Sequence, residues 1–504
     1  MYHPRTFFQN MVFTSANFVI FLILTVVLYY VLPKKVRWLV LLLASCIFYI
    51  AEDVKALGFM AGTTVITYAV SQCFTSKNDD RKGQKGKGAL FVIALLLDLG
   101  VLLLTKYTGF AYEIINTFRK SQPLTAPKLL VPMGVSFYTF RTVAYLADVY
   151  RGKCSPEKNP LKFFLYISFF PTVVQGPITR YADLAPQLYS GKGADEKTFW
   201  FGVQRILWGF FKKLVIADRA GIAVQTIVGD VDTFKGGYAL FYIALFMFEL
   251  YADFSGGMDI ALGVSELFGI PVQENFLRPF FSKSAGEFWR RWHATMGAFF
   301  RDYIYIPLGG DGRNAKTSAG KNVVFYRNMI VVWLATGLWH GAGFNFIIWG
   351  VLNLAVLLLE AATSPLTKKF QETALSKTKG FQIFRMVRTT IIVSFIMSLL
   401  SFSESKTAFA LWGSIFTTAN YGEVFKGGLL NLGLVMHDYV ILGAGFVLLF
   451  LVALLQRTGS VREKLLKLPY VLRFLLFLVL FVSILLFGIY GVGYDASQFI
   501  YNRF

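Results

Sequence analysis

Long apolar runs constrain this chain more than any other feature of its sequence. Residues 12–32, 89–105, 439–455 and 470–493 each carry at most one charged side chain. A run of about 20 apolar residues is long enough to cross the hydrocarbon core of a bilayer as a helix. Only 16% of the 504 residues are charged, compared with about 25% in ordinary soluble domains. The sequence therefore predicts an all-α polytopic membrane protein.

The eight clearest spans fall near residues 12–32, 37–51, 56–74, 89–105, 346–362, 386–403, 439–455 and 470–493. We expect ten to twelve transmembrane helices in total, with re-entrant or interfacial helices besides. Basic residues at 34–37 and in the loop before residue 88 predict cytoplasmic loops, and the acidic pair at 52–53 predicts an external one. The N-terminus is then outside the cytoplasmic membrane, and the first apolar run stays as a span because it lacks the features of a cleaved signal peptide.

The net charge of +21 follows from these loops, so it indicates topology and contact with the lipid bilayer rather than nucleic-acid binding. Cys46, Cys73 and Cys154 are scattered and form no CxxC pair. They are expected to pack as small apolar side chains, with no disulfide framework and no metal site.

The chain divides by pattern into N-terminal spans (residues 1–125), a central core (126–350) and C-terminal spans (351–504). Prolines and glycines interrupt the apolar stretches of the core at residues 129–153 and 163–188. In a membrane, broken helix is tolerated where it is buried in protein or lines a cavity. The core is thus expected to surround a cavity.

Two of the four histidines lie in this core. His340 follows Trp339 and is flanked by Gly337, Gly341 and Gly343, glycines that permit close backbone approach or a helix break. A polar group at membrane depth usually serves a function, and a histidine suits general-base catalysis near neutral pH. The alternative is a core histidine bonded between helices. His3 and His437 are read as surface and helix-end residues.

His293 lies in "SAGEFWRRWHATMGAFFRDYIYIPLGG". As one continuous helix, this segment places Trp289, His293 and Met296 on one face and Arg290 elsewhere. An amphipathic helix at the membrane interface is the alternative interpretation, but it gives no reason for the histidine.

Three carboxylates, Glu249, Asp253 and Asp259, also lie in an apolar context. Glu249 and Asp253 are four residues apart and share a helix face, which would suit a proton-coupled transporter. Pairing with arginines such as Arg278, Arg290 or Arg301 is the favoured alternative.

Five motifs in order resemble the membrane-bound O-acyltransferase (MBOAT) family. They are "FYTF…YLADVYRG", "FFPTVVQGPITR", "ADFSGGMDIALG", "NFLRPFFSKSAGEFWRRWHATMGAFFRDYIYIPLGG" and "GLWHGAGFNFIIWG". The likeness is strongest over residues 129–350, and its AlgI-like alginate O-acetyltransferase branch is nearer than the D-alanyl transferase branch typified by DltB. Arg141 and the "GGMD" sequence depart from the family pattern.

The resemblance implies a ring of helices around a central funnel, with His340 and His293 as the catalytic histidines. It implies transfer of an acyl group, most simply acetyl, from acetyl-CoA or another acyl thioester, such as an acyl carrier protein, to a polysaccharide hydroxyl. An extracytoplasmic acyltransferase or esterase-like partner would complete the transfer, and no bound cofactor is expected. The residues expected to line the substrate channel are Trp339, Trp292, Asp253, Arg290, Arg301 and Asn345. D-alanyl transfer to teichoic acid, a transporter and a structural scaffold stay open as alternatives.

Overall fold

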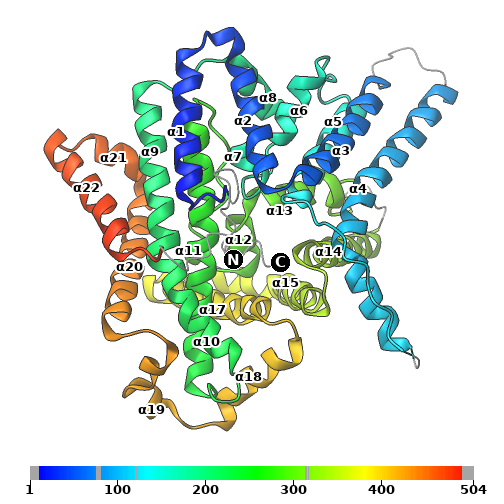
Figure 1. Cartoon of the computed structure of the whole chain (residues 1–504). Coiled ribbons are helices and arrows are strands. Elements are labelled where there is room, and N and C mark those ends of the chain that lie inside the picture. Colours follow the sequence, from blue (N-terminus) through cyan, green and yellow to red (C-terminus); the bar gives the residue numbers. More distant parts are fainter. Residues whose placement is uncertain (1–10, 75–80, 120–121, 313–314, 316, 491–504) are drawn as a thin grey trace. The chain divides into compact units, whose positions relative to one another are not determined.

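The computed structural model describes residues 11–74, 81–119, 122–312, 315 and 317–490. All regular secondary structure in these ranges is helical (Figure 1). No strand occurs in those ranges. The all-α fold class predicted from the apolar runs is therefore confirmed. His3 lies outside the described residues.

The helices belong to two compact units. Within the described residues, the first unit comprises residues up to 206 together with 258–273, and the second comprises 207–257 together with 274–490. The predicted division into three successive segments, 1–125, 126–350 and 351–504, assigns a role to each segment. The two compact units do not test those roles, so the division stays a prediction.

The first unit contains the N-terminal helices and the short helices that follow them. In chain order they are α1 (Ala16–Val31), α2 (Arg37–Glu52), α3 (Val54–Gln72), α4 (Arg81–Phe118), α5 (Val135–Tyr150), α6 (Pro160–Ser168), α7 (Phe170–Val173), α8 (Tyr181–Ser190) and most of α9 (Glu196–Phe210).

The second unit begins at Leu207, near the end of α9, and it holds a π-helix at Phe211–Ala217 and both core histidines. Its larger helices are α10 (Asp218–Gly229), most of α11 (Gly237–Leu267), α14 (Ser318–His340), α15 (Phe344–Gln371), α17 (Lys379–Ser398), α18 (Ser405–Thr417), α20 (Met436–Leu455) and α22 (Tyr470–Phe487). Its shorter helices include α12 (Ala285–Arg291), α13 (Ala294–Phe300), α16 (Ala374–Lys377), α19 (Tyr421–Phe425) and α21 (Val461–Leu466).

Seven helices of the described chain are long and apolar enough to cross a membrane, by length and composition. They are Val54–Gln72, Gly86–Phe118, Gly237–Leu267, Phe344–Gln371, Lys379–Ser401, Met436–Thr458 and Tyr470–Phe487. All eight spans proposed from the sequence are helices, but α1 and α2 have 16 residues each. Their length explains part of the difference from the ten to twelve spans expected. The chain is a multi-pass membrane protein.

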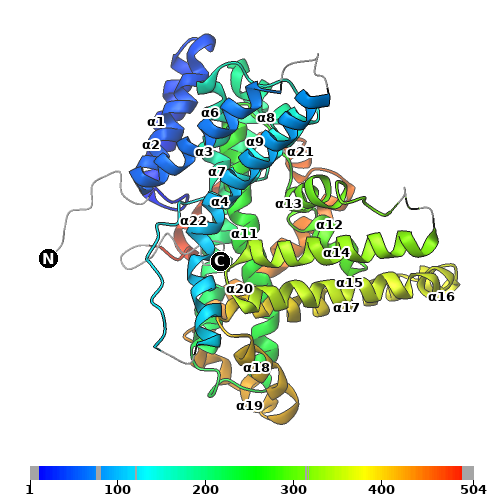
Figure 2. The ribbon, with the colours of Figure 1, turned by 90° about the vertical axis from the view of Figure 1, so that its right-hand side faces the viewer.

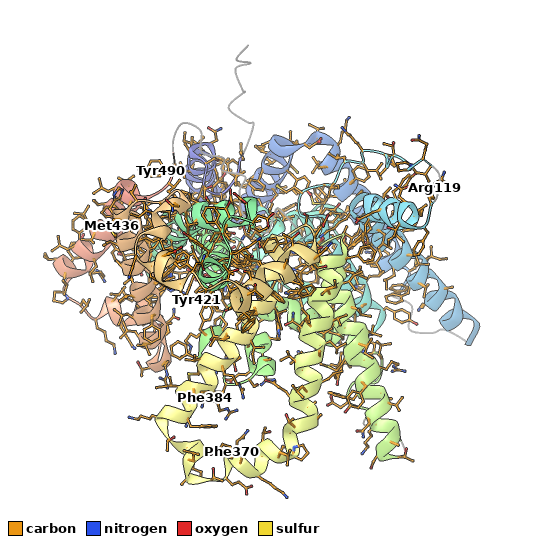
Figure 3. The ribbon with its side chains drawn as sticks, turned by 90° about the horizontal axis from the view of Figure 1, so that it is seen from below. Arg119, Phe370, Phe384, Tyr421, Met436 and Tyr490 are labelled. Carbon is orange, nitrogen blue, oxygen red and sulfur yellow. The ribbon has the colours of Figure 1, made fainter. Side chains whose placement is uncertain are left out.

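The last helices expose apolar side chains along their length. In α22, Val471, Val479 and Leu486 are each at least 65% exposed. Such a surface would be a liability in water, but a bilayer is the solvent in which it is stable. Phe370 of α15 and Phe384 of α17, labelled in Figure 3, are exposed apolar rings as well.

The region after α5 is broken into short helices, as its prolines and glycines predicted. A buried arginine, Arg141, bonds to the carbonyl oxygens freed there. It donates to the oxygens of Tyr166, Ile167 and Thr172 at 2.7–3.3 Å. The residue that departs from the family pattern therefore stabilises the interruption between α6 and α7.

Candidate active site

A tight helical hairpin places His340. The imidazole belongs to the last residue of α14, and α15 begins four residues later at Phe344. Gly337 and Gly350 bring the two backbones together, because a Cβ on Gly337 would lie 2.5 Å from the carbonyl oxygen of Phe346 and 3.4 Å from the Cα of Gly350. Figure 2 shows α14 and α15 side by side. The predicted roles of the glycines, close approach and a helix break, are both confirmed.

The ring of His340 is nearly buried, with 8% of the residue exposed. Two indoles contact it at steep angles. Its centroid lies 4.9 Å from that of Trp339 and 4.6 Å from that of Trp349, with interplanar angles of 67° and 70°. The imidazole is therefore held by packing against aromatic edges and faces.

The segment that carries His293 is not one helix. The prediction of a continuous helix through Trp289, His293 and Met296 was wrong, because α12 ends at Arg291 and α13 starts at Ala294. His293 itself has a left-handed backbone, with φ of 47°. This conformation is uncommon for a residue with a side chain and persists only where the surroundings hold it.

Asn275 holds this break in place. Its backbone oxygen accepts the N–H of Ala294 at 3.0 Å, and its side-chain oxygen accepts the N–H and the hydroxyl of Thr295 at 3.0 and 2.9 Å. A backbone N–H can only donate, so the side-chain atom facing Thr295 is the amide oxygen. The same oxygen lies 3.2 Å from Nδ1 of His293.

This geometry selects a tautomer for His293. Since Nδ1 faces an acceptor, Nδ1 carries the hydrogen and Nε2 keeps its lone pair. The residue is fully buried, and burial lowers the pKa of its imidazole to about 3. His293 is therefore a neutral ring with a defined acceptor nitrogen.

The two core histidines are brought together by one indole. Trp339 contacts the ring of His293 at a centroid distance of 5.7 Å and that of His340 at 4.9 Å. Phe254 of α11 packs on His293 from another side, 4.9 Å away. Two histidines separated by 47 positions in the chain (340 − 293) thus share one aromatic neighbour.

Three further tryptophans complete this aromatic cluster. Trp289 lies 5.1 Å from Trp333 and 5.5 Å from Trp349. Trp333 and Trp349 are 6.1 Å apart. Sequence reasoning singled out neither Trp333 nor Trp349 and missed Asn275. Trp349 and Asn275 each lie within one of the five family motifs, and this position in a motif could have pointed to them.

The other predicted channel residues take different positions. Trp292 and Asn345 are buried, and the Asn345 amide donates to the carbonyl oxygen of Phe402 at 2.8 Å. Arg290 is exposed, and Arg301 is exposed beside Asp302, with 2.7 Å between nitrogen and oxygen. His437 is exposed in the first turn of α20, as its helix-end interpretation requires.

The expected pairing with arginines holds for Asp259, although its partner is not one of the three arginines named, and it is wrong for Asp253. Asp253 pairs with Lys213 at 2.5 Å, and the same ammonium group reaches Asp218 at 2.8 Å. Asp259 pairs with Arg205 at 3.0 Å. Lys213 belongs to the π-helix and is fully buried. Glu249 lies against Gly221 of α10.

Within the ranges that the structure describes, no group of three or more His, Cys, Asp or Glu side chains is arranged to hold a metal ion. The chemistry that this site offers is proton transfer by imidazole in an aromatic enclosure.

Comparison with known proteins places the site in context. A family model described as "MBOAT, membrane-bound O-acyltransferase family" matches residues 155–403, a range that contains both histidines. Over 430 residues the chain is 33% identical to "Probable alginate O-acetylase AlgI" of Pseudomonas syringae pv. tomato, covering 84% of this chain and 79% of that protein.

Two further relatives differ in the group they transfer. The peptidoglycan O-acetyltransferase of Helicobacter pylori is 32% identical over 362 residues, which is 67% of this chain and 66% of that protein. The teichoic acid D-alanyltransferase of Bacillus subtilis is 29% identical over 284 residues, which is 54% of this chain and 67% of that protein.

Proposed function

Since the chain belongs to the membrane-bound O-acyltransferase family, we propose that it transfers an acetyl group from a cytoplasmic thioester to a hydroxyl of a cell-envelope polysaccharide. The thioester is either acetyl-CoA or an acetyl group carried on an acyl carrier protein. The enzyme class is that of the family, an O-acyltransferase. The identities of the acyl group, the donor and the acceptor go beyond the family assignment and are our proposal.

The extent of similarity favours acetyl over D-alanyl transfer. The relatives named as O-acetylating enzymes align with 84% and 67% of this chain, against 54% for the D-alanyltransferase. Both O-acetylating relatives are named for polysaccharides, alginate and peptidoglycan. A polysaccharide acceptor is consistent with both names.

In this mechanism His340 is the general base. It takes the proton of the acceptor hydroxyl as the oxygen attacks the thioester carbonyl, and it returns a proton to the leaving thiolate. Positioned acid–base catalysis by a side chain contributes about 10²- to 10⁴-fold to a rate. The residue keeps 8% of its surface exposed and both ring nitrogens are buried, so the proposal requires the surrounding side chains to move when the reactants bind.

His293 orients the reactants. Its Nε2 is an acceptor because Asn275 occupies Nδ1, so it can accept a hydrogen bond from a neighbouring hydroxyl of the polysaccharide and leave the proton of the attacking hydroxyl to His340. Trp339 and Trp292 exclude water from the reaction, which protects the acyl group from hydrolysis.

The observation that carries this proposal is the contact of both histidines with Trp339. A histidine that merely fills the core needs no second imidazole beside the same indole. The reaction joins a cytoplasmic donor to an external acceptor, so we further propose that an esterase-like partner outside the membrane completes the transfer to the polysaccharide.

The test is His340→Ala in the full-length chain, expressed in a host that lacks its own relative. The readout is alkali-labile acetate on the isolated envelope polysaccharide. We expect at least a 100-fold loss with normal amounts of folded protein in the membrane. His437→Ala, at the exposed histidine, is the control and should retain activity.

Normal acetylation by His340→Ala would overturn the assignment of the base. If His293 is also replaceable without loss, the chain is a scaffold for an assembly and not the transferase itself. The transporter alternative predicts ion-dependent flux in proteoliposomes without acyl transfer. The Lys213 partner of Asp253 does not favour it, because the carboxylate is already neutralised by a buried cation.

A further inference from the structure

Two indole N–H groups in the aromatic cluster are buried without an acceptor. Trp349 is 0% exposed. Among the described residues, neither its Nε1 nor that of Trp289 has a hydrogen-bond partner. An indole nitrogen is a donor and nothing else, and a buried donor without an acceptor is costly and uncommon in native proteins.

One donor lies beside the proposed base, and the second lies against the first. Trp349 contacts the ring of His340 at 4.6 Å, closer than the 4.9 Å contact of Trp339. Trp289 meets Trp349 at 5.5 Å with the two ring planes perpendicular. The enclosure around His340 therefore offers two hydrogen-bond donors for which the described chain supplies no acceptor.

Acyl transfer supplies such an acceptor. When the hydroxyl oxygen bonds to the thioester carbon, the π electron pair of the carbonyl moves to its oxygen and makes an oxyanion. The pair then re-forms the carbonyl, the carbon–sulfur bond breaks, and the thiolate leaves with the proton that His340 held. A donor aimed at the oxyanion lowers the barrier to both steps.

We propose that Trp349 is a catalytic residue that donates its indole N–H to this oxyanion, with Trp289 as a second donor. The proposal rests on the proposed function, because it needs a thioester carbonyl next to His340. It explains why two indole N–H groups are kept unbonded in a buried cluster.

A structural reading of the same geometry is an N–H···π contact between the two perpendicular indoles. That contact would stabilise the cluster and leave the reaction unchanged. The two readings therefore differ in the kinetic constants of a variant that keeps the ring and loses the N–H group.

The experiment compares wild type, Trp349→Phe and a protein with 3-benzothienylalanine at position 349, which keeps the fused ring and loses the N–H group. The assay is done in membranes, with radiolabelled acetyl-CoA as donor and the envelope polysaccharide of the host as acceptor. We expect kcat to fall by about 100-fold with KM for acetyl-CoA within about threefold, since removing one oxyanion donor typically costs 10²–10³ in kcat. Trp289→Phe should have a smaller effect in the same direction.

The matched control is Trp412→Phe, which removes an indole N–H that is already bonded to the Ser398 hydroxyl at 3.0 Å. It should keep kcat within about twofold. If Trp349→Phe does not fold, as judged by size-exclusion chromatography in detergent, the benzothienyl protein decides the test, because sulfur replaces the N–H and the ring shape is intact.

A wild-type kcat in Trp349→Phe or in the benzothienyl protein would overturn the inference and leave the proposed function standing. Absence of acyl transfer by the wild-type chain itself would overturn the proposed function and this inference with it.

Discussion

The segments that carry His340 and His293 hold their imidazole rings in place by different interactions. His340 ends a helix, and its ring is held by the packing of Trp339 and Trp349 against it, on a hairpin whose backbones touch. His293 sits in a left-handed backbone, and its ring is held by a hydrogen bond to Asn275. Packing fixes a position, whereas a hydrogen bond also fixes which nitrogen carries the proton.

The largest expected effect comes from breaking the hydrogen-bonded support. Asn275→Ala removes the acceptor of the Thr295 N–H, the Thr295 hydroxyl and His293 Nδ1. At about 1 kcal/mol for each bond, the free energy of unfolding should fall by about 2–3 kcal/mol. Acetyl transfer should fall at least tenfold, because His293 loses its tautomer.

A conservative variant separates these two effects. Asn275→Asp keeps an acceptor at Nδ1 and adds a negative charge, which raises the pKa of His293. Its pH–activity profile should therefore shift to higher pH relative to wild type. An unshifted profile together with full activity would mean that Asn275 serves the backbone alone.

Breaking the packed support tests the other half of the comparison. Gly337→Ala places a methyl group against the Phe346 carbonyl oxygen, so α14 and α15 must separate. Overpacking of this kind costs about 1–3 kcal/mol, which thermal unfolding in detergent would detect. Gly443→Ala in α20, where a Cβ meets nothing within 4 Å, is the control. Equal melting temperatures for both variants would contradict the packed hairpin.

A smaller effect is expected at the far end of the His293 segment. Glu360 of α15 accepts the N–H groups of Ala285 and Gly286 at 2.6 and 3.0 Å, where α12 begins. Glu360→Ala should lower the free energy of unfolding by about 1–2 kcal/mol and reduce activity a few-fold, while Glu360→Gln should retain more of both. Loss of all activity in Glu360→Gln would assign the carboxylate a role beyond holding α12.

The smallest effect is a pH dependence. Burial lowers the pKa of folded His293 to about 3 from an ordinary value near 6.5, so the fold favours the neutral ring. The stability that follows is fully present above about pH 6.5 and is lost as the pH falls toward 3. The melting temperature of wild type should thus drop between pH 7 and pH 5 more than that of His293→Asn, since asparagine tolerates the left-handed backbone. His437→Asn should behave like wild type.

The contrast between the segments also marks what sequence can predict. The spans and the helix break beside His340 followed from apolar length and from glycine positions, both of which are local signals. The break at His293 did not, because Asn275 imposes it from 18 positions away and a continuous helix satisfies the local pattern equally well. The Lys213 partner of Asp253 was missed for a similar reason, since the two residues are 40 positions apart.

The Gly337–Gly350 contact has a consequence for how such a chain can diverge. Because the two backbones are in direct contact there, no side-chain conformation determines the spacing of α14 and α15. Exchanging one side chain for a smaller one therefore cannot change this spacing. A relative with a wider space around His340 must therefore gain it by replacing the rings that surround the hairpin with smaller side chains.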